Sequence, residues 1–432
     1  MNLRHAQQPI TALSRRRFCA VGLAPVIAAA LPAFGRDRFE TDAPALWAGV
    51  AVRAAALALA PGLPPFISAR AYAMAFLAAH DALQAINPAY GTYLAPMSAP
   101  GANADAAVAA AVHGVLVKEW PFAAALLDTE YTRAIAAIKG EGSKPKGIEL
   151  GQRAAAAMRA SRANDGLANI DGPYVPGVEP GKYRFMPPLN FAAGVNLGTQ
   201  LRPFAIHDGS DFRVAAPYAV TDAAYAADYN DVKTLGAAFG STRTAEQSEI
   251  GKFWLENTND SWLQVAVQLA TSRDMPGWEL LRAMALLQMA QVDAYIACFE
   301  SKYFYNFWRP MTAIQLGDSD GNPATAGDDK WISFDFPCPP VPDYPSGHAA
   351  SGGAGAAVLA NVFGSDAAIF THTSASLPGP TRNFTSFTQM ADEIAVSRIY
   401  AGYHFRLAVT RGAAQGKAVT AQVLATQLPR RF

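Results

Sequence analysis

The sequence predicts an all-α fold. Alanine and leucine recur with helical spacing along most of the chain, and breaker residues separate these segments. No segment of any length alternates apolar and polar residues as a half-buried strand would. Hydrophobic residues make up 51% of the 432 residues, which is enough for a sizeable core. Together these observations indicate packed helices joined by loops.

The N-terminal helices are expected between about residues 43 and 165. The sequence Pro-Gly-Leu-Pro-Pro at 61–65 separates the first two of them. Asn103 precedes the third, where its side-chain oxygen can accept a hydrogen bond from a first-turn amide. The predicted helices of this region cover residues 43–59, 68–85, 103–119, 123–139 and 146–164.

From 166 to 210 the helical pattern gives way to Gly, Pro, Asn and aromatic residues without a sustained period. Long irregular stretches inside a compact protein are more often functional than disordered. We therefore expect an ordered loop that wraps the helices and shapes an entrance.

A C-terminal bundle is expected over about residues 221–428. A second long loop, 317–344, carries Asp318, Asp320, Asp328 and Asp329 but lacks the closing glutamate of a hand-type calcium loop, so it predicts solvated turns. The predicted helices around it cover residues 221–239, 245–256, 262–272, 278–305, 346–363, 386–401 and 409–427.

The first 33 residues resemble a bacterial twin-arginine export signal. A Ser-Arg-Arg-Arg-Phe motif at 14–18 precedes an apolar run at 19–31 with alanine-rich exits. The resemblance implies a single mature domain at 34–432 that works in the periplasm or outside the cell. No other segment reaches the roughly 18 to 20 continuous apolar residues of a membrane span.

Charge and cysteine content exclude several classes of protein. Charged residues are only 16% of the chain and the formal net charge is zero, which indicates neither nucleic-acid binding nor a polybasic membrane surface. Residues 1–33 hold four arginines and no acid, so their removal leaves 31 basic against 35 acidic residues. Three cysteines are too few for a disulfide framework. The sequence is compatible with either a Cys298–Cys338 disulfide or two free thiols.

Two pairs of basic residues are spaced so that they can converge. Lys302 and Arg309 are seven residues apart, which places both on one face of a helix that Pro310 would end. Arg398 and His404 are six residues apart, so on one straight helix they would diverge by about 120°. They can meet only if the chain turns, and the turn is expected near Gly402, with His404 on or before the next helix.

Between these pairs lies Tyr-Pro-Ser-Gly-His at 344–348. Pro345 favours a helix start here, where the amides of Ser346, Gly347 and His348 lack intrahelical acceptors and the helix dipole favours an anion. An oxyanion with about two negative charges can be buried only with such dense charge-assisted bonding. The segments together predict an oxyanion pocket.

The three segments resemble the signature of the superfamily that joins vanadium-dependent haloperoxidases with type 2 phosphatidic acid phosphatases and bacterial acid phosphatases. That signature is Lys, six residues and Arg-Pro; then Pro-Ser-Gly-His; then Ser-Arg, five residues and His. The surrounding sequence is more similar to the haloperoxidases, notably Asn-Phe-Trp-Arg-Pro-Met-Thr-Ala-Ile at 306–314 and Ser-Arg-Ile-Tyr-Ala-Gly-Tyr-His-Phe-Arg at 397–406.

The resemblance implies a fold built around a four-helix core that holds vanadate. His404 Nε2 would be the axial ligand to vanadium, and His348 the acid–base residue. Hydrogen peroxide would be activated with help from Lys302, and an oxygen atom would pass to a halide, giving a hypohalous species that reacts with a small organic acceptor. Vanadium keeps its oxidation state, so neither haem nor flavin is needed, and a homo-oligomer is compatible with the family. The vanadate oxygens would be bound by Lys302, Arg309, Ser346, the Gly347 amide and Arg398.

Two other functions use the same residues. In a phosphatase, His404 would attack phosphorus to form a phosphohistidine and His348 would protonate the leaving group. A non-catalytic oxyanion binder is the third function, and Ala408 supports it, because many family members carry an aspartate there that orients the metal-binding or nucleophilic histidine. A further departure is Val341, where characterised haloperoxidases often have an aromatic residue or histidine; Phe299 is a candidate pocket wall.

Overall fold

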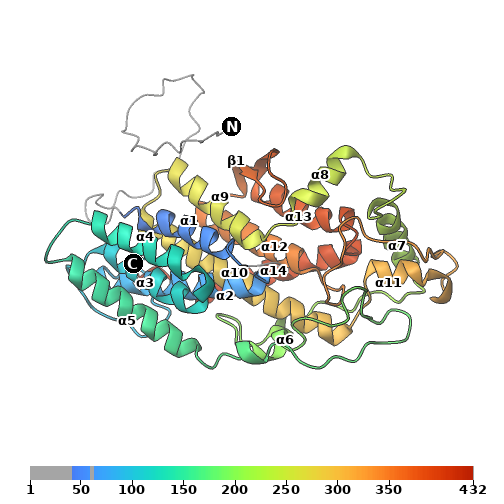
Figure 1. The fold of residues 1–432 in the computed structure, drawn as a ribbon, viewed down its shortest axis with the longest axis horizontal. Coiled ribbons are helices and arrows are strands. Elements are labelled where there is room, and N and C mark those ends of the chain that lie inside the picture. The colour runs from blue at the N-terminus through green and yellow to red at the C-terminus, as the bar shows by residue number, and fades with distance from the viewer. Residues whose placement is uncertain (1–40, 59–62, 432) are drawn as a thin grey trace, which may run out of the picture. The chain divides into compact units, whose positions relative to one another are not determined.

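The computed structural model describes residues 41–58 and 63–431. The predicted export signal at 1–33 lies outside the described residues, so it stays a prediction. Helices dominate the described chain, and the expected all-α class is confirmed (Figure 1). The α-helices are α1 (Ala43–Ala55), α2 (Pro65–Ile86), α3 (Ala104–Glu119), α4 (Ala124–Ala137), α5 (Lys144–Arg162), α6 (Leu197–Gln200), α7 (Ala223–Leu235), α8 (Ala245–Phe253), α9 (Thr258–Ser272), α10 (Gly277–Tyr305), α11 (Pro310–Gln315), α12 (Gly347–Phe363), α13 (Phe387–Tyr400) and α14 (Arg406–Thr426).

The 29-residue helix α10 is the central element of the fold. Its side chains are buried almost without interruption from Leu280 to Lys302, and most of them are apolar. It packs against α2, α12 and α14. Figure 1 shows α10 between the N-terminal helices, coloured blue to green, and α12–α14, coloured orange to red. Lys302 therefore reaches the C-terminal bundle from the last turn of a rigid core helix.

Small residues bring α12 and α14 close together. A Cβ atom at Gly412 would overlap the carbonyl group of Ser346, and one at Gly416 would overlap the carbonyl group of Ala350. Glycine at these two positions therefore allows the backbone of α14 to lie directly against the first turn of α12. This contact positions the start of α12, where the candidate site lies.

A short hairpin was not expected from the sequence. Strands β1 (Ala367–Thr373) and β2 (Thr381–Ser386) pair antiparallel, with Phe370 opposite Phe384 and their rings 5.4 Å apart. Alternate residues of β1 are buried, but alanine and histidine fill two of the buried positions, so the apolar alternation is weak in the sequence.

The breaks at the ends of α10 and α13 position the basic residues. Lys302 and Arg309 do not share one helix as predicted, because Asn306 adopts a left-handed conformation (φ 56°) and ends α10. Pro310 begins α11 instead of ending a helix, since proline fits the first helical position. The predicted turn at Gly402 (φ 81°) is confirmed, and it places His404 before α14.

The irregular segment 166–210 is tied to the core helix. The carboxylate of Asp293, in α10, accepts hydrogen bonds from the amides of Phe204, Ala205 and Ile206 at 2.7 to 3.0 Å. The predicted N-cap of α3 is also confirmed, because Asn103 accepts a bond from the Ala106 amide. In the described part of the chain no single helix is long and apolar enough to cross a membrane; α3 and the helical segment after it meet that length and composition test only as a bent pair.

Candidate oxyanion-binding site

The three predicted cations converge at the ends of their helices. Lys302 lies in the last turn of α10, Arg309 directly precedes α11, and Arg398 lies in the last turn of α13. All three side chains are about 1% exposed. Their burial is notable because a buried charge is costly unless it is paired.

Backbone carbonyl oxygens hold these cations in place. Lys302 Nζ donates to the carbonyl groups of Pro342 (2.7 Å) and Asp343 (3.0 Å). Arg309 donates to Val341 from Nε (2.7 Å) and to Tyr403 from Nη1 (2.8 Å).

Arg398 is held in the same way, since its Nη2 donates to the carbonyl group of Trp254 at 2.6 Å. Among the described residues, neither Arg309 Nη2 nor Arg398 Nη1 has an acceptor, and none of the three cations donates to a carboxylate. The site therefore keeps an excess of positive charge and donors that an anion can use.

The lowered pKa values of Lys302 and Arg398 show that burying their charges costs free energy. Burial, and then the charge of Arg309, lower the pKa of Lys302 to about 8. Burial likewise lowers the pKa of Arg398 to about 10. A bound dianion would offset this penalty, because opposite charge favours the protonated form of both groups.

The start of α12 provides the predicted hydrogen-bond donors. Ser346 is the N-cap residue, and its hydroxyl oxygen accepts a long bond from the Ala349 amide at 3.5 Å. Its own amide donates to the carbonyl group of Ala408 at 2.9 Å, so α14 fixes this turn. The amides of Gly347 and His348 belong to the first turn, where they have no intrahelical acceptor. Together with the helix dipole they favour an anion here.

The imidazole of His404 lies between a cation and a carboxylate. Its Nδ1 is 2.8 Å from Asp343 Oδ1, and its Nε2 is 3.0 Å from Arg309 Nη1. Burial, followed by the charges of Arg309, Lys302 and Arg398, lowers the pKa of His404 well below its ordinary value. These contacts assign the proton to Nδ1, which donates to Asp343, and leave a lone pair on Nε2. A neutral imidazole whose Nε2 lone pair faces the donor Arg309 can bind a metal or attack phosphorus when that contact is exchanged for the ligand.

Asp343 supplies the carboxylate that Ala408 lacks, and this role of Asp343 was not predicted from the sequence. We expected His404 to find a different partner, such as a backbone carbonyl group, or to be less well held. Asp343 is 61 residues away along the chain and about 1% exposed, and burial raises its pKa to about 7 against the lowering effect of Arg309. The only sequence signal was an acidic residue just before the Pro-Ser-Gly-His motif, and its pairing with His404 depends on the turn at Gly402.

His348 is half-buried at the rim of the same cluster. Its Nε2 lies 3.3 Å from the carbonyl oxygen of Glu256, and burial and the charge of Arg398 lower its pKa to about 3. The carboxylate of Glu256 bonds to His372 of the unpredicted hairpin at 2.5 Å, and His372 stacks on Trp254. The 254–256 segment thus contacts both Arg398 and His348, although no motif indicated it.

The remaining sequence candidates lie as follows. Cys298 and Cys338 are both buried free thiols, with the Cys298 sulfur 3.4 Å from the carbonyl oxygen of Pro345. Phe299 packs edge-on against Phe66 in the core. Val341 is buried and contributes its carbonyl oxygen to Arg309.

The residues present fit a bound oxyanion such as vanadate. Buried cations, helix-start amides and a serine hydroxyl suit the oxygens of an anion with about two negative charges. The lone pair on His404 Nε2 suits a coordination bond, and Asp343 behind the ring resembles the carboxylate–histidine arrangement common at metal sites.

Comparisons with known proteins show what this chain is similar to. The family model described as the VCPO second helical-bundle domain matches residues 282–429, which contain every predicted site residue. A vanadium chloroperoxidase from Curvularia inaequalis is 28% identical over 160 residues, covering 30% of this chain and 26% of that protein. The match thus spans about a quarter of that relative.

Two solved structures share the fold. A bacterial vanadium-dependent iodoperoxidase superposes with a TM-score of 0.76 at 23% identity, covering 90% of this chain and 97% of that one. An apo-type bacterial vanadium-dependent chloroperoxidase gives a TM-score of 0.67 at 18% identity, covering 84% and 93%. Residues 282–429 thus match the family model of the VCPO second helical-bundle domain, and the described chain shares the fold of two bacterial vanadium-dependent haloperoxidases.

Proposed function

We propose that this protein is a vanadium-dependent haloperoxidase that oxidises a halide with hydrogen peroxide. In the overall reaction, hydrogen peroxide, a halide ion and one proton give a hypohalous acid and water. The observation that carries the proposal is the neutral imidazole of His404, which Asp343 holds at Nδ1 and whose Nε2 lone pair faces Arg309 among the buried cations. The family of the relatives supports the same conclusion.

The cage would bind vanadate through the residues predicted from the sequence. Lys302, Arg309 and Arg398 would neutralise its oxygens, and His404 Nε2 would hold the vanadium. Ser346 and the Gly347 amide would donate to the remaining oxygens. When bound, vanadate supplies a Lewis-acidic centre at which hydrogen peroxide is activated for oxygen transfer. Backbone carbonyl groups position the cations without neutralising them, and Arg309 Nη2 and Arg398 Nη1 have no acceptor among the described residues.

His348 would move the proton that the reaction consumes. Burial, and then the charges of Arg398, Arg309 and Lys302, lower the pKa of its ring, so His348 is neutral while no anion is bound. An anion in the cage would raise the pKa of His348 toward the working pH, which is the range in which a general acid or base is effective.

A combined assay tests the proposal. Purified protein is reconstituted with vanadate, its vanadium content is measured, and peroxide-dependent halogenation of a phenol dye is followed with chloride, bromide and iodide. About one vanadium per chain and halogenation with at least one halide are expected. Hydrolysis of a phosphomonoester without halogenation would instead establish the phosphohistidine mechanism at His404.

Oxyanion binding with neither activity would establish a non-catalytic binder. The argument for that function from the sequence was the missing carboxylate at Ala408, and Asp343 now occupies the corresponding role. We also propose export by the twin-arginine route, and fractionation of an expressing bacterium would show the mature protein in the cytoplasm if this is wrong.

A further inference from the structure

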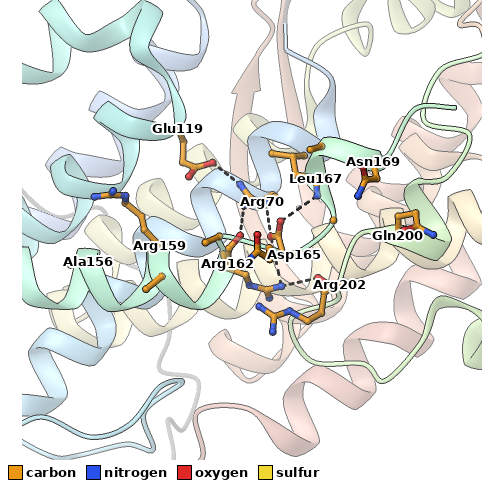
Figure 2. Close-up of a pocket in the computed structure, with 15 residues that line it drawn as sticks. Arg70, Glu119, Ala156, Arg159, Arg162, Asp165, Leu167, Asn169, Gln200 and Arg202 are labelled. Carbon is orange, nitrogen blue, oxygen red and sulfur yellow. Dashed lines mark hydrogen bonds and ion pairs between the residues drawn. The ribbon is translucent and has the colours of Figure 1, made fainter.

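A second polar cavity lies among the N-terminal helices, apart from the oxyanion site. It has a volume of about 900 Å³ and lies between α2, the end of α3, the end of α5 and the segment around α6 (Figure 2). None of its lining residues belongs to α10–α14. Its charged lining residues are Arg70, Glu119, Arg159, Arg162, Asp165 and Arg202.

Two carboxylates neutralise Arg70. Its Nη1 donates to Glu119 at 2.6 Å and its Nε donates to Asp165 at 2.8 Å. Asp165 is buried, and its other oxygen accepts a long bond from the Leu167 amide at 3.4 Å. Figure 2 shows Arg70 between these two acids. With one guanidinium and two carboxylates this group carries a net charge of −1, and its ion pairs hold the cavity wall together.

Arg162 carries a buried charge that is held by neutral acceptors. Its guanidinium donates to the carbonyl groups of Arg202 (2.7 Å) and Pro203 (3.1 Å) and to the hydroxyl group of Tyr93 (3.0 Å). The carboxylate of Asp165 is 3.9 Å away and already bonded to Arg70. The positive charge of Arg162 is therefore only partly offset.

Arg159 and Arg202 add further positive charge at the rim. Arg159 is half-buried and has no hydrogen bond or ion pair within the described residues, whereas the exposed Arg202 donates to the carbonyl group of Ser161. In the view of Figure 2 they lie on opposite sides of the Arg162–Asp165 pair. With four guanidinium groups and two carboxylates, the lining has a surplus of two positive charges.

We propose that this cavity binds a small organic dianion. A ligand with two negative charges would balance the surplus of two positive charges in the lining. Guanidinium groups bind both carboxylates and phosphates. The rest of the lining includes small alkyl side chains, those of Ala156, Ala160, Ala163, Leu167 and Ala168, which suit an apolar ligand body. The volume also lies within the roughly 300–1,000 Å³ of small-molecule sites.

Titration calorimetry at low ionic strength tests this site on the full chain. The probes are succinate, a dicarboxylate, and glycerol 3-phosphate, a phosphomonoester, so that the two sources of a dianion are compared directly. The Arg159→Ala/Arg202→Ala double variant is expected to bind the preferred probe at least tenfold more weakly. Neither side chain neutralises a carboxylate, so the variant should fold, and circular dichroism checks this.

Two matched variants locate the binding. Arg153→Ala removes an exposed arginine from α5 outside the cavity, and Arg309→Ala removes a cation of the oxyanion site; binding of the probe should stay within twofold in both. Loss of binding in Arg309→Ala alone would place the probe in the oxyanion site and overturn the proposal. Equal weakening in Arg153→Ala, or no binding of either probe at millimolar concentration, would also overturn it.

Discussion

Replacing Asp343 by asparagine separates the two ways in which the site can hold an anion. The substitution keeps the size of the side chain and an oxygen that can face Nδ1 of His404, but it removes the negative charge. The bond at 2.8 Å to His404 then loses its charge assistance, while the three cations keep their carbonyl partners. A ligand that binds to the histidine should lose affinity, and a ligand that binds only to the cations should keep its affinity.

The size of the effect follows from the lost interaction. A hydrogen bond to a charged group contributes about 1.5–3 kcal/mol, and each 1.4 kcal/mol is about tenfold in affinity. Vanadate affinity should therefore fall roughly 10- to 100-fold, the range typical of partners behind a metal-binding histidine. Sulfate has a similar shape but forms no coordination bond. Its affinity should stay the same or rise, because a nearby negative charge has been removed.

Equilibrium titration of both anions, for wild type and variant at pH 7.5, makes this comparison. The double variant Asp343→Asn/Ala408→Asp moves the carboxylate to the position four residues after His404 and should recover most of the lost vanadate affinity. If vanadate and sulfate weaken by the same factor in Asp343→Asn, the carboxylate supports the fold of the site and does not orient the imidazole, and the reasoning is refuted.

Three further predictions concern charge, packing and thiols. Because the pKa of Lys302 is about 8, its cation is present below that pH and lost above it, so sulfate affinity should decline above pH 8 by up to about tenfold per pH unit. The Lys302→Arg variant should show no such decline; an identical decline would assign it to another group. Gly412→Ala forces a methyl group against the first turn of α12 and should lower the free energy of unfolding by about 1–3 kcal/mol in a urea titration. Gly142→Ala, with no atom near the added methyl group, serves as the control, and equal stability of the two variants would contradict the packing argument. Cys298 and Cys338 should both be alkylated in denaturant without reductant. Alkylation of only one of them, or of neither, would contradict the free-thiol structure.

The fold could be predicted from the sequence where helical spacing was long and breakers were clear. Asn103 and Gly402 act as expected, because capping and left-handed turns depend on local chemistry. Pro310 was assigned to the wrong side of a helix boundary, since proline is compatible with both a helix end and a first turn. The β1–β2 hairpin was not predicted, because its alternation of buried and exposed residues is short and the buried positions are partly polar.

The site was predictable as a set of residues but not as a set of contacts. Spacing and motif pointed to the cations and both histidines, and the structure brings Lys302, Arg309, Arg398 and His404 together. Asp343 could not be assigned, because nothing local marks a carboxylate that pairs with a histidine 61 residues later. The groups that hold the cations could not be predicted either, because they are backbone carbonyl oxygens, which every residue has.

One short segment, residues 341–348, makes most of the contacts that organise the oxyanion site. Its carbonyl groups hold Arg309 and Lys302, its one carboxylate holds His404, and its last residues cap α12 and present the free amides. Because these groups follow one another along eight residues of backbone, adding or deleting a single residue would move some of them relative to the others. Length variation among related chains should therefore be confined to the preceding loop, for example around Gly321, where no atom lies near an added Cβ.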